Sequence, residues 1–176
     1  MPSTEDVERV VVGVDGSEGS LAALRQAVHE ARCHGAELCP VIAWTPPGGE
    51  ALTAQCPVPE PEDLRREWIR LARARLDAAC ARILGDAGAD LTVSSRVLRG
   101  RAEDVLTRSA RKPTDLLVMG AGSHGRLHRL LFGSVSRLAL KRAQCPVLVV
   151  HPDQGHAALD PGQRTAATDQ ATSADR

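Results

Sequence analysis

One glycine-rich segment, residues 115–136, carries the residue types best suited to bind an anion. Four apolar residues, 116–119, come first, as in a strand that is buried on both faces of a parallel sheet. Several glycines follow, and a Gly-Ser pair at 133–134 precedes a helical pattern that begins at Val135. Glycines let an anion approach the main chain, and a helix N-terminus offers free N–H groups and the positive end of the helix dipole. The segment predicts a phosphate site, and its alternative is a plain turn between a strand and a helix.

The composition limits the classes of protein to consider. The chain has 176 residues, which is room for one domain with a good core, and its 22 basic side chains balance 22 acidic ones. A net charge of zero gives no global attraction to nucleic acid or to a membrane surface. With two Trp, one Phe and no Tyr, the chain cannot build base-stacking platforms for single strands. We therefore expect neither nucleic acid nor a membrane as a partner.

Other features of the sequence suggest where the protein works. No apolar run is long enough to span a bilayer, and the acidic start of the chain has no apolar signal core, which predicts a cytoplasmic protein. The five cysteines are scattered and form no CxxC pair, so they are interpreted as reduced thiols that bind no metal.

Strand-like and helical patterns alternate along the chain. Pro40 lies inside the second strand-like run, where it cannot donate a ladder hydrogen bond and is expected at an edge, an end or a bulge. The arginines of the long helical segment alternate with acidic residues, which is typical of an ordinary solvated face. The expected strands are 9–15, 37–44, 91–98, 116–119 and 147–150, and the expected helices are 18–34, 60–84, 102–111 and 135–143.

This alternation predicts an α/β fold, with a parallel sheet between two layers of helices. In such sheets ligands bind outside the carboxyl ends of the strands, where the strand order reverses. Asp15 at the end of the first strand and Gly120 at the end of the fourth are expected to meet at that crevice. The domain is expected to span 9–152, after an extension over 1–8. The polar segment 153–176 cannot bury enough apolar surface to offset the entropy of ordering, which predicts a disordered tail.

Four blocks of this sequence resemble the universal stress protein family. They are VVVGVDGSEGSLAAL, GAELCPVIAW, DLLVMGAGSHGRLHRLLFGSVS and CPVLVV, in the family's order and spacing from Val10 to Val150. The resemblance implies a five-stranded sheet of order 3-2-1-4-5 and a homodimer paired through the last strand, Val147 to Val150. It also implies ATP, or AMP or ADP, as the ligand, with or without Mg²⁺. The implied role is stress-response signalling without efficient catalysis.

Nucleotide-binding members of the family share a glycine motif that fits this chain in two registers. The motif is glycine, two residues, glycine, nine residues, then glycine followed by Ser or Thr. Starting at Gly122 puts Gly125 at the second glycine but leaves only seven residues before Gly133. Starting at Gly120 keeps the nine-residue spacing and puts Ser123 at the second glycine. We prefer the second register because Gly120 directly follows the strand and one substitution is milder than a shortened loop.

The resemblance also assigns roles to residues by position. Asp15 would meet the ribose, and Gly13, Val14 and Met119 would border the adenine. Pro40 stands where the family has an aliphatic residue whose amide reaches the base. Proline lacks that amide, so one bond to the base is lost unless Val41 takes over the role. The phosphate cradle would comprise Gly120, Ser123, Gly133, Ser134, Val135 and Ser136, with Gly122 beside Ser123.

Three functions remain open from the sequence. The leading one is nucleotide binding without efficient catalysis, because no motif fixes a base for attacking water and the Walker lysine is missing. The second is a dimeric interaction module that binds no nucleotide, which Ser123 and Pro40 favour and the intact Gly133 and Asp15 oppose. The third is a nucleotidyltransferase-like enzyme, although the HGRLH interval at 124–128 is not the HxGH spacing of such enzymes.

Overall fold

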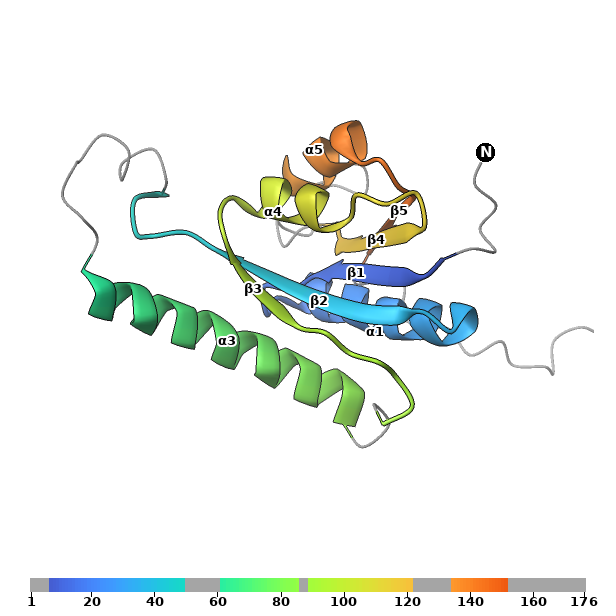
Figure 1. Ribbon diagram of the computed structural model, residues 1–176, viewed down its shortest axis with the longest axis horizontal. Coiled ribbons are helices and arrows are strands. Elements are labelled where there is room, and N and C mark those ends of the chain that lie inside the picture. Colours follow the sequence, from blue (N-terminus) through green and yellow to red (C-terminus); the bar gives the residue numbers. More distant parts are fainter. Residues whose placement is uncertain (1–6, 50–60, 86–88, 122–133, 152–176) are drawn as a thin grey trace, which may run out of the picture.

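The computed structural model describes residues 7–49, 61–85, 89–121 and 134–151, and its strands and helices alternate (Figure 1). The strands form a parallel sheet of order β3-β2-β1-β4-β5, which confirms the predicted fold class and strand order. The elements are β1 (Arg9–Gly13), α1 (Glu18–His34), β2 (Glu37–Trp44), α3 (Glu62–Leu84), β3 (Arg96–Arg99), α4 (Ala102–Ser109), β4 (Asp115–Gly120), α5 (Ser134–Arg142) and β5 (Val147–Val150). Within the described ranges, no helix is long and apolar enough to cross a membrane.

Each face of the sheet has its own apolar core because successive strand residues point to opposite faces. In β1, Val10 and Val12 pack in the core that also holds Leu24 of α1 and Leu76 of α3. Val11 packs instead in the core on the side of α4 and α5. Figure 1 shows these two helix pairs covering opposite faces of the sheet. All five strands point the same way, so their carboxyl ends share one edge.

The third strand is shorter than predicted, and Pro40 explains the difference. The prediction of a strand over 91–95 is wrong except for an isolated bridge, since β3 begins only at Arg96. The amide of Leu38 donates toward the segment before β3, at 2.9 Å, so the nitrogen of Pro40, two residues later, faces the same side. Proline has no hydrogen to donate there, and regular pairing resumes only at Val41, opposite Arg96.

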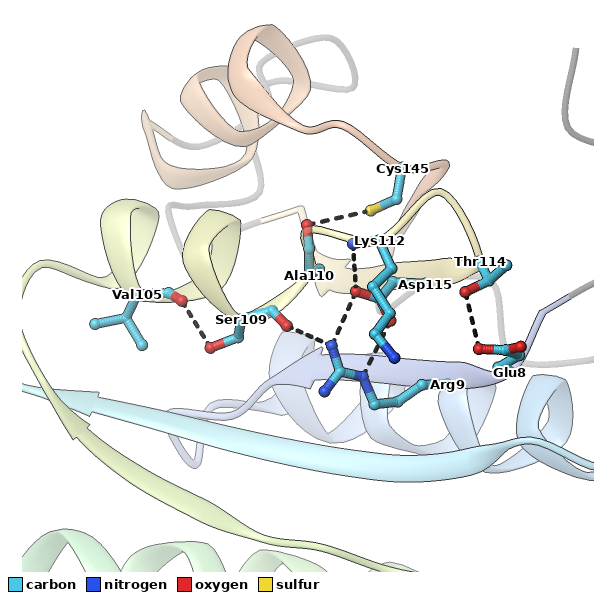
Figure 2. Close-up of polar contacts among 9 residues, drawn as sticks. All are labelled: Glu8, Arg9, Val105, Ser109, Ala110, Lys112, Thr114, Asp115 and Cys145. Carbon is cyan, nitrogen blue, oxygen red and sulfur yellow. Dashed lines mark hydrogen bonds and ion pairs between the residues drawn. The ribbon is translucent and has the colours of Figure 1, made fainter.

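An ion pair joins β1 to β4 at the amino-terminal edge of the sheet (Figure 2). Arg9 donates through Nε and Nη2 to the two carboxylate oxygens of Asp115, at 3.0 and 2.9 Å. Asp115 is fully buried and also accepts the amide of Lys112 at 2.9 Å. The hydrogen bond with Asp115 raises the pKa of Arg9. Because Arg9 also donates to the carbonyl of Ser109 at 2.9 Å, it fixes the end of α4 relative to the sheet.

Candidate functional site

The turn after β1 holds Asp15 at the carboxyl edge of the sheet. Its Oδ1 accepts the amide of Ser17 at 2.8 Å, which closes a tight side-chain turn. Gly16, inside the turn, has a φ of +86°, a conformation that favours glycine. Ser17 then begins α1, because its hydroxyl accepts the amide of Ser20 at 3.2 Å as an N-cap. Asp15 itself remains exposed.

The hydroxyl of Ser20 organises this turn from inside. It accepts the amides of Asp15 and Gly16 at 3.3 and 3.1 Å and donates to the carbonyl of Ser17 at 2.9 Å. Burial alone would raise the pKa of Asp15, but the hydrogen bonds from Ser17 and Ser20 outweigh it and lower that pKa. Asp15 is therefore an anion at neutral pH. Sequence reasoning did not include Ser20 among the site residues. The signal that could have found it is a second hydroxyl residue three positions after the N-cap Ser17.

Gly120, at the end of β4, meets the first turn of α1 backbone to backbone. A Cβ added to Gly120 would lie 2.6 Å from the carbonyl oxygen of Gly19 and 2.7 Å from its carbonyl carbon. Only glycine permits this approach. The residue after Gly19 is Ser20, which holds the turn of Asp15, so the structure brings the two predicted sides of the crevice together.

The start of α5 is tied to the same point. The hydroxyl of Ser136 is buried and donates to the carbonyl of Gly120 at 3.0 Å. The N-termini of α1 and α5 therefore converge on the end of β4. The first turn of α5 contains no acidic residue, whereas α1, α3 and α4 each have at least one there. The first turn of α5 thus supplies no carboxylate of its own to the positive end of the helix dipole.

The predicted adenine-bordering residues lie at or just below this edge. Met119 is buried in the core under α4 and α5, and Val135, which was predicted for the phosphate cradle, packs against the same core. Gly13 faces α4, since an added Cβ would lie 2.8 Å from Cδ1 of Leu106. The buried Val14 donates its amide to the carbonyl of Val41 at 2.9 Å.

Pro40 and Val41 occupy different positions relative to this edge. Pro40 is fully buried within the sheet, and its nitrogen faces β3 rather than the crevice. Val41 is the β2 residue that pairs with Gly13 and contacts Val14. The carbonyl of Val41 is thus already bonded to the amide of Val14, and Pro40 weakens the pairing with β3.

Part of the predicted site lies outside the described residues. Gly122, Ser123 and Gly133 belong to this part. The segment 124–128 and the predicted tail also lie outside the described residues. The choice between the two glycine registers therefore stays a prediction. Among the residues that the structure does describe, no three His, Cys, Asp or Glu side chains are grouped as a metal site would require.

Arg75 of α3 reaches the turn of Asp15 and was not predicted as a site residue. Its Cγ and Cδ both lie 3.2 Å from the place that a Cβ of Gly16 would occupy. The aliphatic part of the Arg75 side chain thus passes over Gly16. Arg75 is an exposed residue, and its guanidinium lies beside the site. The pattern of α3 suggested only a solvated face, and no local spacing could reveal a contact between α3 and the turn after β1.

Taken together, the fold and this edge define a doubly wound parallel α/β domain with a candidate ligand site where the strand order reverses. The profile of the Universal stress protein family matches residues 6–151, so the chain belongs to the universal stress protein family.

Individual relatives agree with this assignment. The chain is similar to a universal stress protein of Thermus aquaticus, with 32% identity over 145 residues, covering 80% of this chain and 96% of the relative. It is 32% identical over 150 residues to one of Mycolicibacterium smegmatis, covering 82% of this chain but only 48% of that protein, about half its length. It also resembles the crystal structure of a universal stress protein in complex with cAMP, at 30% identity and a TM-score of 0.51, covering 84% and 98% of the two chains.

Proposed function

We propose that this protein binds an adenine nucleotide at the carboxyl edge of its sheet and acts as a stress-response regulator without efficient catalysis. The convergence at Gly120 carries the proposal. There β4 ends against the backbone of Gly19, and Ser136 of α5 is bonded to the carbonyl of Gly120. The N-terminus of α5, whose first turn holds no acidic residue, makes a favourable place for a phosphate group beside the end of β4. The relative crystallised with cAMP supports a nucleotide as the ligand.

The described residues fit the sugar and phosphates of such a ligand. The ionised carboxylate of Asp15 is an acceptor for ribose hydroxyls, and its lowered pKa keeps it ionised at neutral pH. The phosphates would lie toward the start of α5, near Gly133 and Ser134 in the preferred register. Arg75 supplies a positive charge beside the turn of Asp15, which would offset part of the negative charge of the phosphates. Mg²⁺ would accompany a di- or triphosphate as a counter-ion.

A binding role rather than catalysis follows from the chemistry of the described side chains. Asp15 is the ionised carboxylate at the edge, and a carboxylate with a lowered pKa is a weak base for activating water. The side chain of Arg75 offers N–H donors and no acceptor. We therefore propose at most slow hydrolysis, with the bound nucleotide acting as a signal.

The proposal is tested by identifying what the purified protein carries. Protein isolated without added nucleotide is denatured by heat, and the supernatant is analysed by mass spectrometry. Stoichiometric ATP, ADP, AMP or cAMP supports the proposal and names the ligand. Empty protein that refolds and shows no thermal stabilisation by any of the four would favour the dimeric interaction module instead.

A further inference from the structure

A basic hollow lies at the carboxyl end of β3, beside the start of α4. It is open, has a volume of about 380 Å³, and is lined by Arg99, Gly100, Arg101, Asp104 and Arg108. Three of these residues carry a guanidinium and one carries a carboxylate. Because the whole chain has a formal net charge of zero, the hollow is a local concentration of positive charge rather than part of a basic surface.

The carboxylates at the hollow are already paired with arginines. Asp104 accepts a hydrogen bond from Nη1 of Arg142 at 3.0 Å, and Glu103 pairs with Arg101. Arg108 donates its Nε to the carbonyl of Asp104 at 3.0 Å, a bond within its own helix. Within the described ranges, no ion pair joins Arg108 to a carboxylate. Its remaining N–H donors can therefore serve an external anion.

The backbone keeps this hollow open beside Arg108. Gly100 has a φ of +136°, and a Cβ there would lie 3.3 Å from Nη2 of Arg108. A side chain at position 100 would be strained and would crowd the guanidinium. The amide of Gly100 donates to the carbonyl of Trp44 at 2.9 Å, and the guanidinium of Arg99 lies 5.5 Å from the centre of the Trp44 ring. The wall of the hollow is thus attached to β2.

We propose that this hollow binds the phosphate group of a small molecule, at a site separate from the crevice at Gly120. Guanidinium groups match phosphate oxygens through paired N–H donors and stay charged at any physiological pH. A volume of 380 Å³ lies in the range of roughly 300–1,000 Å³ that small-molecule pockets occupy. The inference does not depend on the proposed nucleotide function, because none of the lining residues belongs to that crevice.

Inorganic pyrophosphate is the probe that tests this site. Trp44 lies under Arg99, so a ligand that draws Arg99 toward the hollow alters the tryptophan emission. The titration uses full-length protein with Gly133→Val, which removes the predicted phosphate cradle of the crevice. We expect a saturable change in emission in this background, and also with Trp68→Phe added, since Trp44 is then the remaining tryptophan.

Substitutions of arginine locate the binding. Arg108→Gln is expected to weaken pyrophosphate binding about tenfold, and Arg108→Lys less, because it keeps the charge but loses the fork of donors. Arg66→Gln on α3 makes the same change of charge away from the hollow and is expected to leave binding unchanged. No saturable binding at millimolar pyrophosphate, or equal losses from Arg108→Gln and Arg66→Gln, would overturn the proposal. Binding that only the Gly133→Val substitution abolishes would place the anion in the crevice instead.

Discussion

The hydroxyl of Ser136 donates to the carbonyl of Gly120 at 3.0 Å, and this bond joins the start of α5 to the end of β4. Ser136 is 2% exposed, so its hydroxyl cannot exchange this partner for water without opening the structure. Between them in the chain lies the segment 122–133, which holds most of the predicted glycine motif. The bond therefore fixes both ends of the segment that is expected to surround the phosphates.

Removing this hydroxyl tests whether the bond supports the site. Ser136→Ala is expected to lower the free energy of unfolding by about 1 kcal/mol, because the bond from a buried hydroxyl to the partly exposed carbonyl of Gly120 is lost. It should also weaken nucleotide binding, since the N-terminus of α5 is no longer held at Gly120. Chemical denaturation and calorimetric titration measure the two effects.

Ser109→Ala is the matched control for this change. The hydroxyl of Ser109 is also buried and donates to a carbonyl, that of Val105, at 2.8 Å, but within α4. A similar loss of stability with unchanged nucleotide affinity is expected. If both variants weaken the affinity equally, the bond between Ser136 and Gly120 has no specific role at the site.

Two glycines at the edge should differ in how well they tolerate alanine. Gly120→Ala places a Cβ against the backbone of Gly19, which cannot move without shifting α1, and a loss of about 2–4 kcal/mol is expected. Gly13→Ala meets only the side chain of Leu106, which can change rotamer, and a loss of about 1 kcal/mol is expected. Urea denaturation compares them. Equal losses would show that the contact between Gly120 and Gly19 is not tight in solution.

The architecture could be predicted from the sequence because it depends on local patterns. Apolar runs and amphipathic stripes placed most strands and helices within a few residues of their observed bounds. The error was the third strand, whose length depends on its neighbour β2. Pro40 of β2 lacks the N–H donor that residues 91–95 would need for regular pairing. A defect in one strand that shortens its neighbour cannot be recognised before the pairing is known.

The site was predictable only where a motif carried it. Asp15 and Gly120 stood out as the ends of apolar strands, and the structure joins them through Gly19 and Ser20. Sequence reasoning gave Gly120 a phosphate-binding role but missed its packing against α1. Arg75 was missed because its contact with Gly16 joins α3 to a distant turn, a tertiary relation with no local signature.

The stability of the protein should depend on the ionisation of Asp15. Its pKa is lower in the folded chain than in the unfolded chain, so the ionised form stabilises the fold above the unfolded pKa of about 4. This contribution is lost as the pH falls through the folded pKa. Between about pH 7 and pH 3, the wild type should lose more stability than Asp15→Asn, by roughly a few tenths of a kcal/mol because Asp15 is exposed. Identical pH dependence of the two proteins would contradict the assignment.

The edge strand β5 should pair with a second copy of the chain. It has one neighbour in the sheet, β4, and an unpaired apolar edge invites association. The bonds from Leu117 to Pro146 and from Ala121 to Val150 fix the alternation of the parallel ladder, so the amide of Val149 faces away from β4. Val149→Pro should therefore convert a homodimer to a folded monomer, as measured by light scattering and circular dichroism. A monomeric wild type at micromolar concentration, or a Val149→Pro variant that remains a dimer, would count against pairing through β5.

Calorimetric titration of ATP, AMP and cAMP into the wild type and Gly133→Val tests the central claim most directly. In the preferred register Gly133 lets the phosphates approach the start of α5, and a valine side chain would occupy that space. We predict saturable binding of at least one nucleotide, with one site per chain, by the wild type. The same nucleotide should give no measurable binding to Gly133→Val, whose circular dichroism should stay unchanged. Undiminished binding by Gly133→Val, or no binding of any of the three by nucleotide-free wild-type protein, would contradict the account.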